Sequence, residues 1–258
     1  MPVKILGVIP ARFASTRFPG KALASLAGKP LLQHVFERAS AARCLNRVVV
    51  ATDDDRIAAA ARQFGAPVRM TRTDHLSGTD RVAEVASAEE ATLVVNIQGD
   101  EPLIDPAAID SAILALLDDP GGAPMGTLKK RIEAPEEVSN PNVVKVVTNR
   151  RGDAIYFSRS PVPYFRGCQQ DGSPPQAAYF KHIGLYVYRR EFLLRYSALP
   201  VGPLETAERL EQLRALENGF RIRVAETEYE SLGVDTPADL ARVTALMESG
   251  WGVTRVHG

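Results

Sequence analysis

Short apolar runs alternate with helical segments through residues 3–117, and this alternation restricts the fold more than any other feature of the chain. The apolar runs cover 3–9, 47–52, 67–70 and 93–97, and the helical segments cover 30–42, 55–64, 80–90 and 106–117. Apolar strands that alternate with helices form βαβ units, whose helices cover both faces of a parallel sheet. We therefore predict an α/β fold whose ligand lies beyond the carboxyl ends of the strands.

The second half of the chain has a less regular pattern. We predict strands at 143–147, 184–188 and 221–225, helices at 204–218 and 237–247, and a mobile loop at 158–175, which is rich in Pro, Gly and polar residues. Asp235 or Thr236 is expected to cap the last helix. A length of 258 residues suits one α/β domain with insertions, or one domain with a lobe.

Composition excludes several classes of protein. Lys plus Arg and Asp plus Glu both total 31, so no overall basic excess favours nucleic acid as a partner. No apolar run approaches the roughly 20 residues that span a bilayer, and the first residues lack the layout of a signal peptide. Cys44 and Cys168 are the only cysteines, which does not make a disulfide framework. We expect a cytoplasmic protein that does not act at a membrane.

A basic loop, residues 10–21, follows the first predicted strand directly. It contains Arg12, Arg17 and Lys21 with two hydroxyl side chains and a Pro-Gly turn. Such a loop can bind a polyphosphate through its cations and backbone N–H groups. Composition alone is equally compatible with a solvated basic loop. The segment is not a Walker A motif, and no G-x-G-x-x-G follows the strand, which weakens the case for a dinucleotide cofactor.

Two aspartates follow apolar segments far apart in the sequence. Asp100 lies in Asn96-Ile97-Gln98-Gly99-Asp100-Glu101-Pro102, and Asp235 lies in Gly233-Val234-Asp235-Thr236-Pro237. Carboxylates suit Mg²⁺, which commonly takes one or two of them and completes its shell with water and substrate phosphate. Spacing alone favours the alternatives, a helix cap for Asp235 and a turn residue for Asp100. Only the fold can bring the two together.

These segments resemble the CMP-Kdo synthetases (3-deoxy-manno-octulosonate cytidylyltransferases). The first loop is similar to the opening signature of that family, and the segment around Asp100 is similar to its metal-binding segment. Further matches follow in family order over nearly the whole chain: Met70-Thr71-Arg72, Asp74-His75-Leu76-Ser77-Gly78-Thr79-Asp80-Arg81, Asn140-Pro141-Asn142-Val143-Val144-Lys145-Val146-Val147, Tyr156-Phe157-Ser158-Arg159, His182-Ile183-Gly184-Leu185-Tyr186, Leu204-Glu205, Leu210-Glu211-Gln212-Leu213-Arg214 and Gly233-Val234-Asp235-Thr236-Pro237. In one departure, Glu230-Ser231-Leu232 stands where the family often has Pro-Gly-Thr.

The resemblance implies a set of site residues. Those implied for CTP are Ala11, Arg12, Ser15, Lys21 and Arg72, with Ser77 and Gly78 near the base. Asp100 and Asp235 would hold Mg²⁺, and with Lys21 they would carry the chemistry. Those implied for the acidic sugar Kdo are Arg17, Gln98, Arg159, His182, Glu211 and Gln212. The family also implies a Rossmann-like three-layer nucleotidyltransferase fold with a mainly parallel mixed sheet. A single domain, 1–258, would include a smaller dimerisation and sugar-binding lobe at about 125–200, in a homodimer.

The implied reaction is attack by the anomeric hydroxyl of Kdo on the α-phosphorus of CTP, giving CMP-Kdo and pyrophosphate and activating Kdo for lipopolysaccharide synthesis. Alternatives remain at this point: another acidic sugar such as 8-amino-Kdo or a sialic acid, a neutral sugar phosphate, or a non-catalytic nucleotide-sensing module. Without the resemblance, a lone His182 is more often a packed residue than a ligand. Glu205, Glu208 and Gln212 would share one helical face, which solvent could simply cover.

Overall fold

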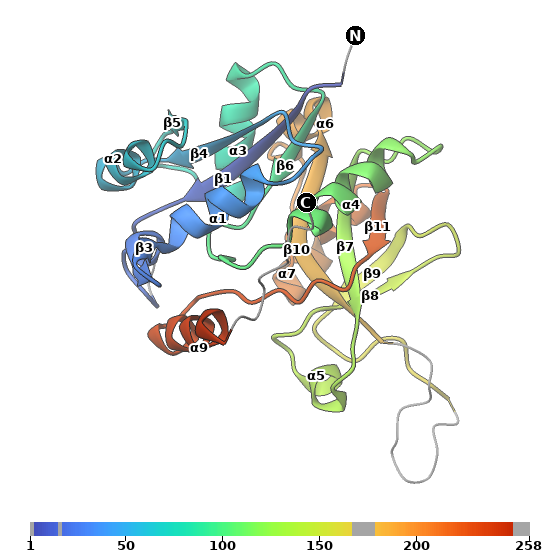
Figure 1. Cartoon of the computed structure of the whole chain (residues 1–258). Helices are drawn as coiled ribbons and strands as arrows, with labels where there is room; N and C mark the ends of the chain where they lie inside the picture. The colour runs from blue at the N-terminus through green and yellow to red at the C-terminus, as the bar shows by residue number, and fades with distance from the viewer. Residues whose placement is uncertain (1–2, 15–16, 167–178, 250–258) are drawn as a thin grey trace. The chain divides into compact units, whose positions relative to one another are not determined.

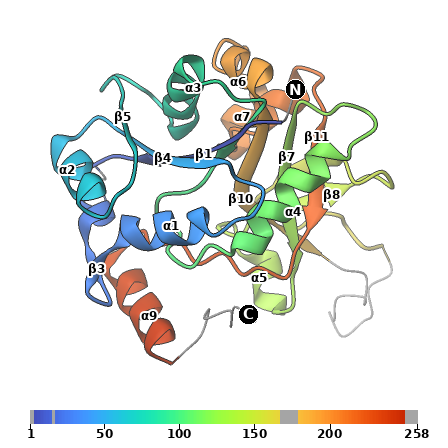
Figure 2. The ribbon, with the colours of Figure 1, turned by 45° about the horizontal axis from the view of Figure 1, so that its top comes forward.

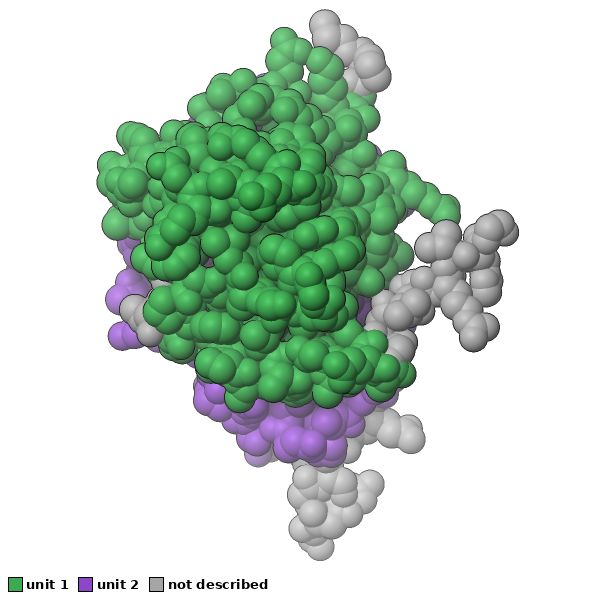
Figure 3. Space-filling view, turned by 60° about the vertical axis from the view of Figure 1, so that its left-hand side comes forward, with its two compact units in different colours: residues 1–110, 231–258 green, residues 111–230 purple. Residues whose placement is uncertain are grey.

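The computed structural model describes residues 3–14, 17–166 and 179–249. The chain divides into two compact units, which Figure 3 colours separately. Unit 1 comprises residues 1–110 and 231–258, and unit 2 comprises residues 111–230. Helix α4, Pro106–Leu117, runs from one unit into the other. The order of the elements along the chain can be followed in Figure 1.

Unit 1 is built on four parallel strands in the order β6-β1-β4-β5. These are β1 (Ile5–Ala11), β4 (Arg47–Thr52), β5 (Val68–Met70) and β6 (Leu93–Asn96). In the register of the sheet, Val8 lies opposite both Val49 of β4 and Asn96 of β6. The central strands are almost completely buried, which explains why their sequences are continuous apolar runs.

Helices cover both faces of this parallel sheet, as the βαβ pattern predicts. They are α1 (Leu31–Ser40), α2 (Asp55–Gln63) and α3 (Gly78–Ala88). Helices α1 and α3 lie on opposite faces of the sheet (Figure 2). A 3₁₀ turn, η1 (Lys21–Leu23), and a small antiparallel pair, β2 (Ser25–Leu26) with β3 (Lys29–Pro30), connect β1 to α1. Helix α9 (Pro237–Glu248) completes unit 1.

Unit 2 has mixed strand pairing. Its strands are β7 (Met125–Arg131), β8 (Lys145–Thr148), β9 (Ala154–Ser158), β10 (Phe180–Arg189) and β11 (Ile222–Glu226). Strand β7 pairs parallel with β11 and antiparallel with β10, and β8 pairs antiparallel with both β9 and β10. Its short helices are α5 (Pro135–Ser139), α6 (Arg190–Tyr196), α7 (Pro203–Glu208) and α8 (Leu213–Glu217). The predicted α/β class, with a mainly parallel mixed sheet, is confirmed.

The prediction of one continuous helix over 204–218 is wrong. The segment forms α7 and α8, and the chain between them turns at Arg209, whose backbone is left-handed with φ 52° and ψ 48°. Its N–H donates to the carbonyl of Glu205, which ends α7. The alternative in which solvent simply covers the face with Glu205, Glu208 and Gln212 does not hold either, because Glu205 and Gln212 are buried. Glu205 is buried and pairs with Arg214 through two hydrogen bonds of 2.8 and 2.6 Å.

Three further expectations concern membrane-spanning helices, the cysteines and the loop at 158–175. Within the described residues, no helix is both long and apolar enough to cross a membrane. Cys44 is a free thiol, whereas Cys168 lies outside the described residues. The expected loop at 158–175 is described only as far as Arg166, where it is irregular.

Candidate active site

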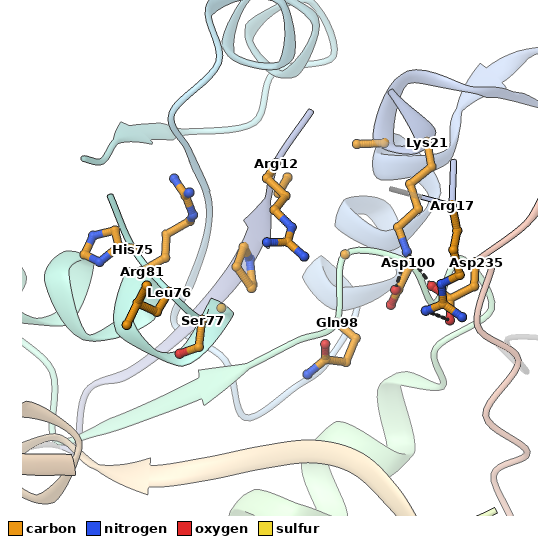
Figure 4. A pocket seen from close by; sticks show the side chains of 15 residues that line it. Arg12, Arg17, Lys21, His75, Leu76, Ser77, Arg81, Gln98, Asp100 and Asp235 are labelled. Carbon is orange, nitrogen blue, oxygen red and sulfur yellow. Dashed lines mark hydrogen bonds and ion pairs between the residues drawn. The ribbon is translucent and has the colours of Figure 1, made fainter. Parts of the chain in front are cut away.

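A cavity of about 420 Å³ lies in unit 1, where the loops after β1 and β6 meet at the carboxyl ends of the strands. Nine of the predicted site residues line it: Ala11, Arg12, Arg17, Lys21, Ser77, Gly78, Gln98, Asp100 and Asp235. The rest of the lining was not predicted: Pro10, Ala22, His75, Leu76, Arg81 and Gly99. Figure 4 shows Lys21, Arg17, Asp100 and Asp235 clustered at one end, with His75, Leu76 and Ser77 at the other. The two ends of the cavity therefore differ in charge: one end is highly charged and the other is less so.

Lys21 joins the two aspartates at the charged end. Its Nζ donates to Asp100 Oδ2 at 2.6 Å, to Asp235 Oδ1 at 3.0 Å and to the carbonyl of Val234 at 3.1 Å. Burial lowers the pKa of Lys21, but the two carboxylates outweigh burial and raise that pKa above its ordinary value. The fold thus brings together two carboxylates that lie far apart in the sequence, and it places a protonated amine between them.

Asp235 does not cap α9, although spacing alone favours that role. Thr236 is the N-cap, since its hydroxyl accepts from the N–H of Asp239 and the Asp239 carboxylate accepts from the N–H of Thr236. This reciprocal arrangement is a capping box. The Asp235 carboxylate is left to pair with Lys21 and with Arg17 Nη2 at 2.9 Å.

The cationic side chains of the cavity differ in whether they already have a hydrogen-bonding or ion-pair partner. Arg17 and Lys21 are paired with aspartates, and Arg81 is buried against Asp53 at 3.0 Å with a further hydrogen bond to Thr71. Arg12 alone has no hydrogen bond or ion pair with any part of the chain that the structure describes. Its charge is therefore available to an anionic ligand without first breaking a contact.

Two sets of hydrogen bonds hold the less charged end in shape. Ser77 caps α3 through a capping box with Asp80. His75 hydrogen-bonds Glu84, whose carboxylate also accepts from the N–H of Arg72 at 3.1 Å. Arg72 itself does not line the cavity, because its side chain is exposed and pairs with Asp74 at 3.3 Å. Ser15, also predicted for CTP, lies outside the described residues.

Gly99 allows the loops after β1 and β6 to approach closely. A Cβ at this position would lie 2.7 Å from the backbone oxygen of Pro10, a distance that requires the backbone to shift. We expect Gly99→Ala to destabilise the fold by about 1–3 kcal/mol and to lower turnover, because it displaces the Asp100 loop. Urea unfolding and initial rates measure the two effects. Gly184→Ala is the control, since its added Cβ meets nothing within 4 Å, and equal behaviour of the two variants would contradict the prediction.

The other predicted sugar residues, Arg159, His182, Glu211 and Gln212, all belong to unit 2. Arg159 donates to backbone carbonyls of Glu208 and Pro141. Gln212 is buried at the start of α8, and the carbonyl of Glu211 accepts from Tyr196 Oη at 2.6 Å. His75 and Arg81 also line the cavity, although neither was among the predicted site residues. Both stand in the quoted Asp74–Arg81 segment, and its position at a helix N-terminus was the available signal.

His182 has a defined tautomer. Its Nε2 lies 2.9 Å from Thr127 Oγ1, and that hydroxyl also donates toward the carbonyls of Ile183 and Leu185. A hydroxyl has one proton, and two backbone carbonyls lie within its reach, so we assign that proton to a carbonyl and Nε2–H of His182 as the donor to Thr127 Oγ1. Nδ1 then carries a lone pair that can accept from a ligand hydroxyl.

We expect His182 to stay neutral throughout the physiological pH range. Burial lowers its pKa to about 3 from the ordinary value of 6.5. The unfolded chain binds this proton below about pH 6.5 and the folded chain does not, so stability should fall as pH decreases from about 6.5 toward 3. Imidazole NMR between pH 8 and pH 4.5, with His182→Asn to assign the signal, should show no titration. A midpoint between 6 and 7 would contradict this.

Known proteins support the chemistry that this cavity suggests. Residues 6–223 match the family described as Cytidylyltransferase. A 3-deoxy-manno-octulosonate cytidylyltransferase of Solibacter usitatus (strain Ellin6076) is 68% identical over 249 residues, which cover 96% of both chains. One of Geobacter sulfurreducens (strain ATCC 51573 / DSM 12127 / PCA) is 59% identical and covers 93% of this chain and 98% of its own. A solved CMP:2-keto-3-deoxy-manno-octonic acid synthetase complexed with CTP superposes with a TM-score of 0.89 at 47% identity, covering 96% of this chain and 99% of that one.

Proposed function

Since the chain belongs to the 3-deoxy-manno-octulosonate cytidylyltransferases, we propose that it transfers CMP from CTP to the anomeric hydroxyl of Kdo and releases pyrophosphate. The observation that carries this proposal is the convergence of Asp100 and Asp235 on Lys21, in a cavity bounded by a basic strand-end loop. A nucleoside triphosphate needs both a cationic surface and a place for its metal, and this end of the cavity offers both.

CTP would lie along the cavity with its phosphates at the charged end. Arg12 is unpaired within the described structure and can bind a phosphate oxygen through its planar fork. Ser77 and Gly78 begin α3 at the other end, next to where the resemblance expects the base. Ala11 and Lys21 also line the cavity.

The two aspartates fit Mg²⁺. Asp100 Oδ2 and Asp235 Oδ1 lie 2.6 and 3.0 Å from the same Lys21 Nζ, so the two oxygens are close to each other. Both aspartate side chains are partly exposed. Two carboxylates with room for water and phosphate suit this ion. Bound there, Mg²⁺ would supply positive charge to the triphosphate. Lys21, released from the carboxylates, would then turn its ammonium toward a phosphate.

In the reaction, the anomeric oxygen forms a bond to the α-phosphorus while the bond from that phosphorus to the bridging oxygen of pyrophosphate breaks. The hydroxyl proton leaves to solvent or to a nearby base. Charge develops on the phosphoryl oxygens and on the leaving group, so Arg12 and Lys21 act by holding and neutralising those oxygens. No covalent intermediate with the protein is required.

The residues that the resemblance implies for the acidic sugar are Arg17, Gln98, Arg159, His182, Glu211 and Gln212. An arginine matches a carboxylate, and the Nδ1 lone pair of His182 matches a sugar hydroxyl. This set is carried by the family resemblance, with the tautomer of His182 as physical support.

The decisive experiment measures pyrophosphate release by the pure protein from CTP, Mg²⁺ and Kdo. Release that depends on all three supports the proposal, and release no faster than the background without enzyme would overturn it. Assays with 8-amino-Kdo and with sialic acid, compared by kcat/KM at matched CTP, distinguish the acidic sugars. Binding of CTP without release for any acceptor would instead indicate a nucleotide-sensing module.

A homodimer in the cytoplasm, supplying CMP-Kdo for lipopolysaccharide synthesis, completes the proposal. Unit 2 exposes large apolar side chains in this single chain, including Ile155 and Val201, each 60% exposed. The homodimer itself is what the family resemblance implies. Light scattering coupled to size-exclusion chromatography should give twice the 28.0 kDa mass of the chain, and a mass of one chain would contradict the dimer.

A further inference from the structure

Glu208, the last residue of α7, accepts hydrogen bonds from three groups of strand β9 and the residue after it. Its Oε1 accepts from Ser158 Oγ at 2.6 Å and from Tyr156 Oη at 3.3 Å, and its Oε2 accepts from the N–H of Arg159 at 2.9 Å. Burial raises the pKa of Glu208, but these donors outweigh burial and lower it, so the carboxylate is charged. A charged, half-buried group that accepts three hydrogen bonds from one segment fixes that segment in place.

The backbone of Glu208 fixes the side chain of Arg159. The Arg159 Nε donates to the carbonyl of Glu208 at 2.7 Å, its Nη1 donates to the carbonyl of Pro141 at 2.9 Å, and its Nη2 lies 3.5 Å from the carbonyl of Arg209. Among the described residues, no carboxylate forms an ion pair with this guanidinium. The contacts therefore orient Arg159 without neutralising its charge, and each terminal nitrogen retains a further N–H.

The next residue, Arg209, holds a strained backbone. A left-handed conformation costs a residue other than glycine about 1–2 kcal/mol, and such strain persists where the surroundings enforce it. The turn at Arg209 directs the chain from α7 to Glu211 and Gln212 before α8 begins. Glu208 thus contacts the segment that carries Arg159, and it directly precedes the turn that leads to Glu211 and Gln212.

Lys145 of β8 stabilises the same region through hydrogen bonds to three backbone carbonyls. It is fully buried, and its amine donates to the carbonyls of Asn140, Val143 and Arg159 at 2.9, 2.6 and 2.6 Å. All three of its donors are satisfied, so Lys145 connects the 140–143 loop to Arg159 and offers no proton to a ligand. Nothing in the proposed reaction uses Lys145 or Glu208 directly.

We propose that Glu208 is a positioning residue for acidic-sugar recognition, which holds the Arg159 guanidinium and the Glu211–Gln212 turn in their binding arrangement before the sugar arrives. Preorganisation of this kind contributes to affinity, because the ordering of the groups is already complete before binding. The inference rests on the proposed function, since it takes Arg159, Glu211 and Gln212 as sugar-binding residues.

The test compares Glu208→Gln with Glu217→Gln. Glu217 is a matched control, because it also accepts hydrogen bonds from the chain near α7, from the N–H groups of Leu204 and Glu205 at 2.8 and 3.0 Å, but at the opposite end of the helix. We expect Glu208→Gln to raise KM for Kdo about tenfold, with KM for CTP changed less than about twofold. Glu217→Gln should change neither KM, although both variants lose stability.

Ser158→Ala covers the case in which Glu208→Gln does not fold. It removes one of the three donors and should raise KM for Kdo by about two- to fivefold, again without changing KM for CTP. The inference is overturned if folded Glu208→Gln has an unchanged KM for Kdo. If only Ser158→Ala folds, an unchanged KM for Kdo in that variant overturns it. So do equal changes in both KM values. Failure of the proposed function is a different result, because the unmodified protein would then release no pyrophosphate with Kdo.

Discussion

Replacing Asp100 or Asp235 with asparagine is expected to reduce kcat by about a thousandfold or more while the protein remains folded. Each substitution removes a negative charge from the pair that would hold Mg²⁺, and an amide is a much weaker ligand for this ion. Loss of charge stabilisation at a transferring phosphoryl group has effects of this size. The measurement is pyrophosphate release at saturating CTP and Kdo, over a range of Mg²⁺ concentrations.

The stability of these variants separates a catalytic role from a structural one. The Asp100 and Asp235 side chains are 29% and 44% exposed, so the ion pairs that each loses should contribute no more than about 1 kcal/mol. Circular dichroism and urea unfolding should show a folded protein. Asp118→Asn, at an exposed position outside the cavity, serves as the control and should retain full activity. If either aspartate variant unfolds, or keeps normal turnover, the aspartate has a structural role instead.

The strands and helices of unit 1 could be predicted from sequence because each is a local pattern. A buried parallel strand must be a continuous apolar run, and α1, α2 and α3 repeat apolar residues at helical spacing. The break at Arg209 has no such signal. Residues 204–218 have good helical composition, and the left-handed turn that divides them is enforced by contacts with Arg159 and by the Glu205–Arg214 pair. Tertiary contacts override local propensity there.

The candidate site was predictable in part for a similar reason. Residues 10–21 and 96–102 lie at the ends of two strands that are neighbours in a parallel sheet, so their meeting follows from the topology. The approach of Asp235 depends on the path of the chain after residue 230, which no local pattern encodes. The deciding detail is that Thr236 and Asp239 cap α9 between themselves, which leaves Asp235 for Lys21. The roles of the individual residues in binding CTP and Kdo stay predictions.

Lys21→Met is expected to lower kcat about a hundredfold or more, although it leaves both aspartates in place. The methionine keeps a side chain of similar length in the cavity but cannot neutralise phosphate charge. The Asp100 and Asp235 carboxylates also lose the amine that they share, so they face each other without a protein counter-charge between them. Turnover and affinity for Mg²⁺ should therefore change in opposite directions.

Thermal shift with Mg²⁺ in the absence of CTP measures that second effect. In the unmodified protein, a cation must displace the Lys21 ammonium from the two carboxylates before it can bind there. Without that competition, Mg²⁺ should bind more tightly to Lys21→Met and raise its Tm by more than it raises that of the unmodified protein. Lys29→Met is the matched control, because Lys29 pairs with Glu37 at an exposed position outside the cavity. If Lys21→Met shows no larger Mg²⁺-dependent shift than Lys29→Met, then Asp100 and Asp235 do not form the metal site, whatever happens to turnover.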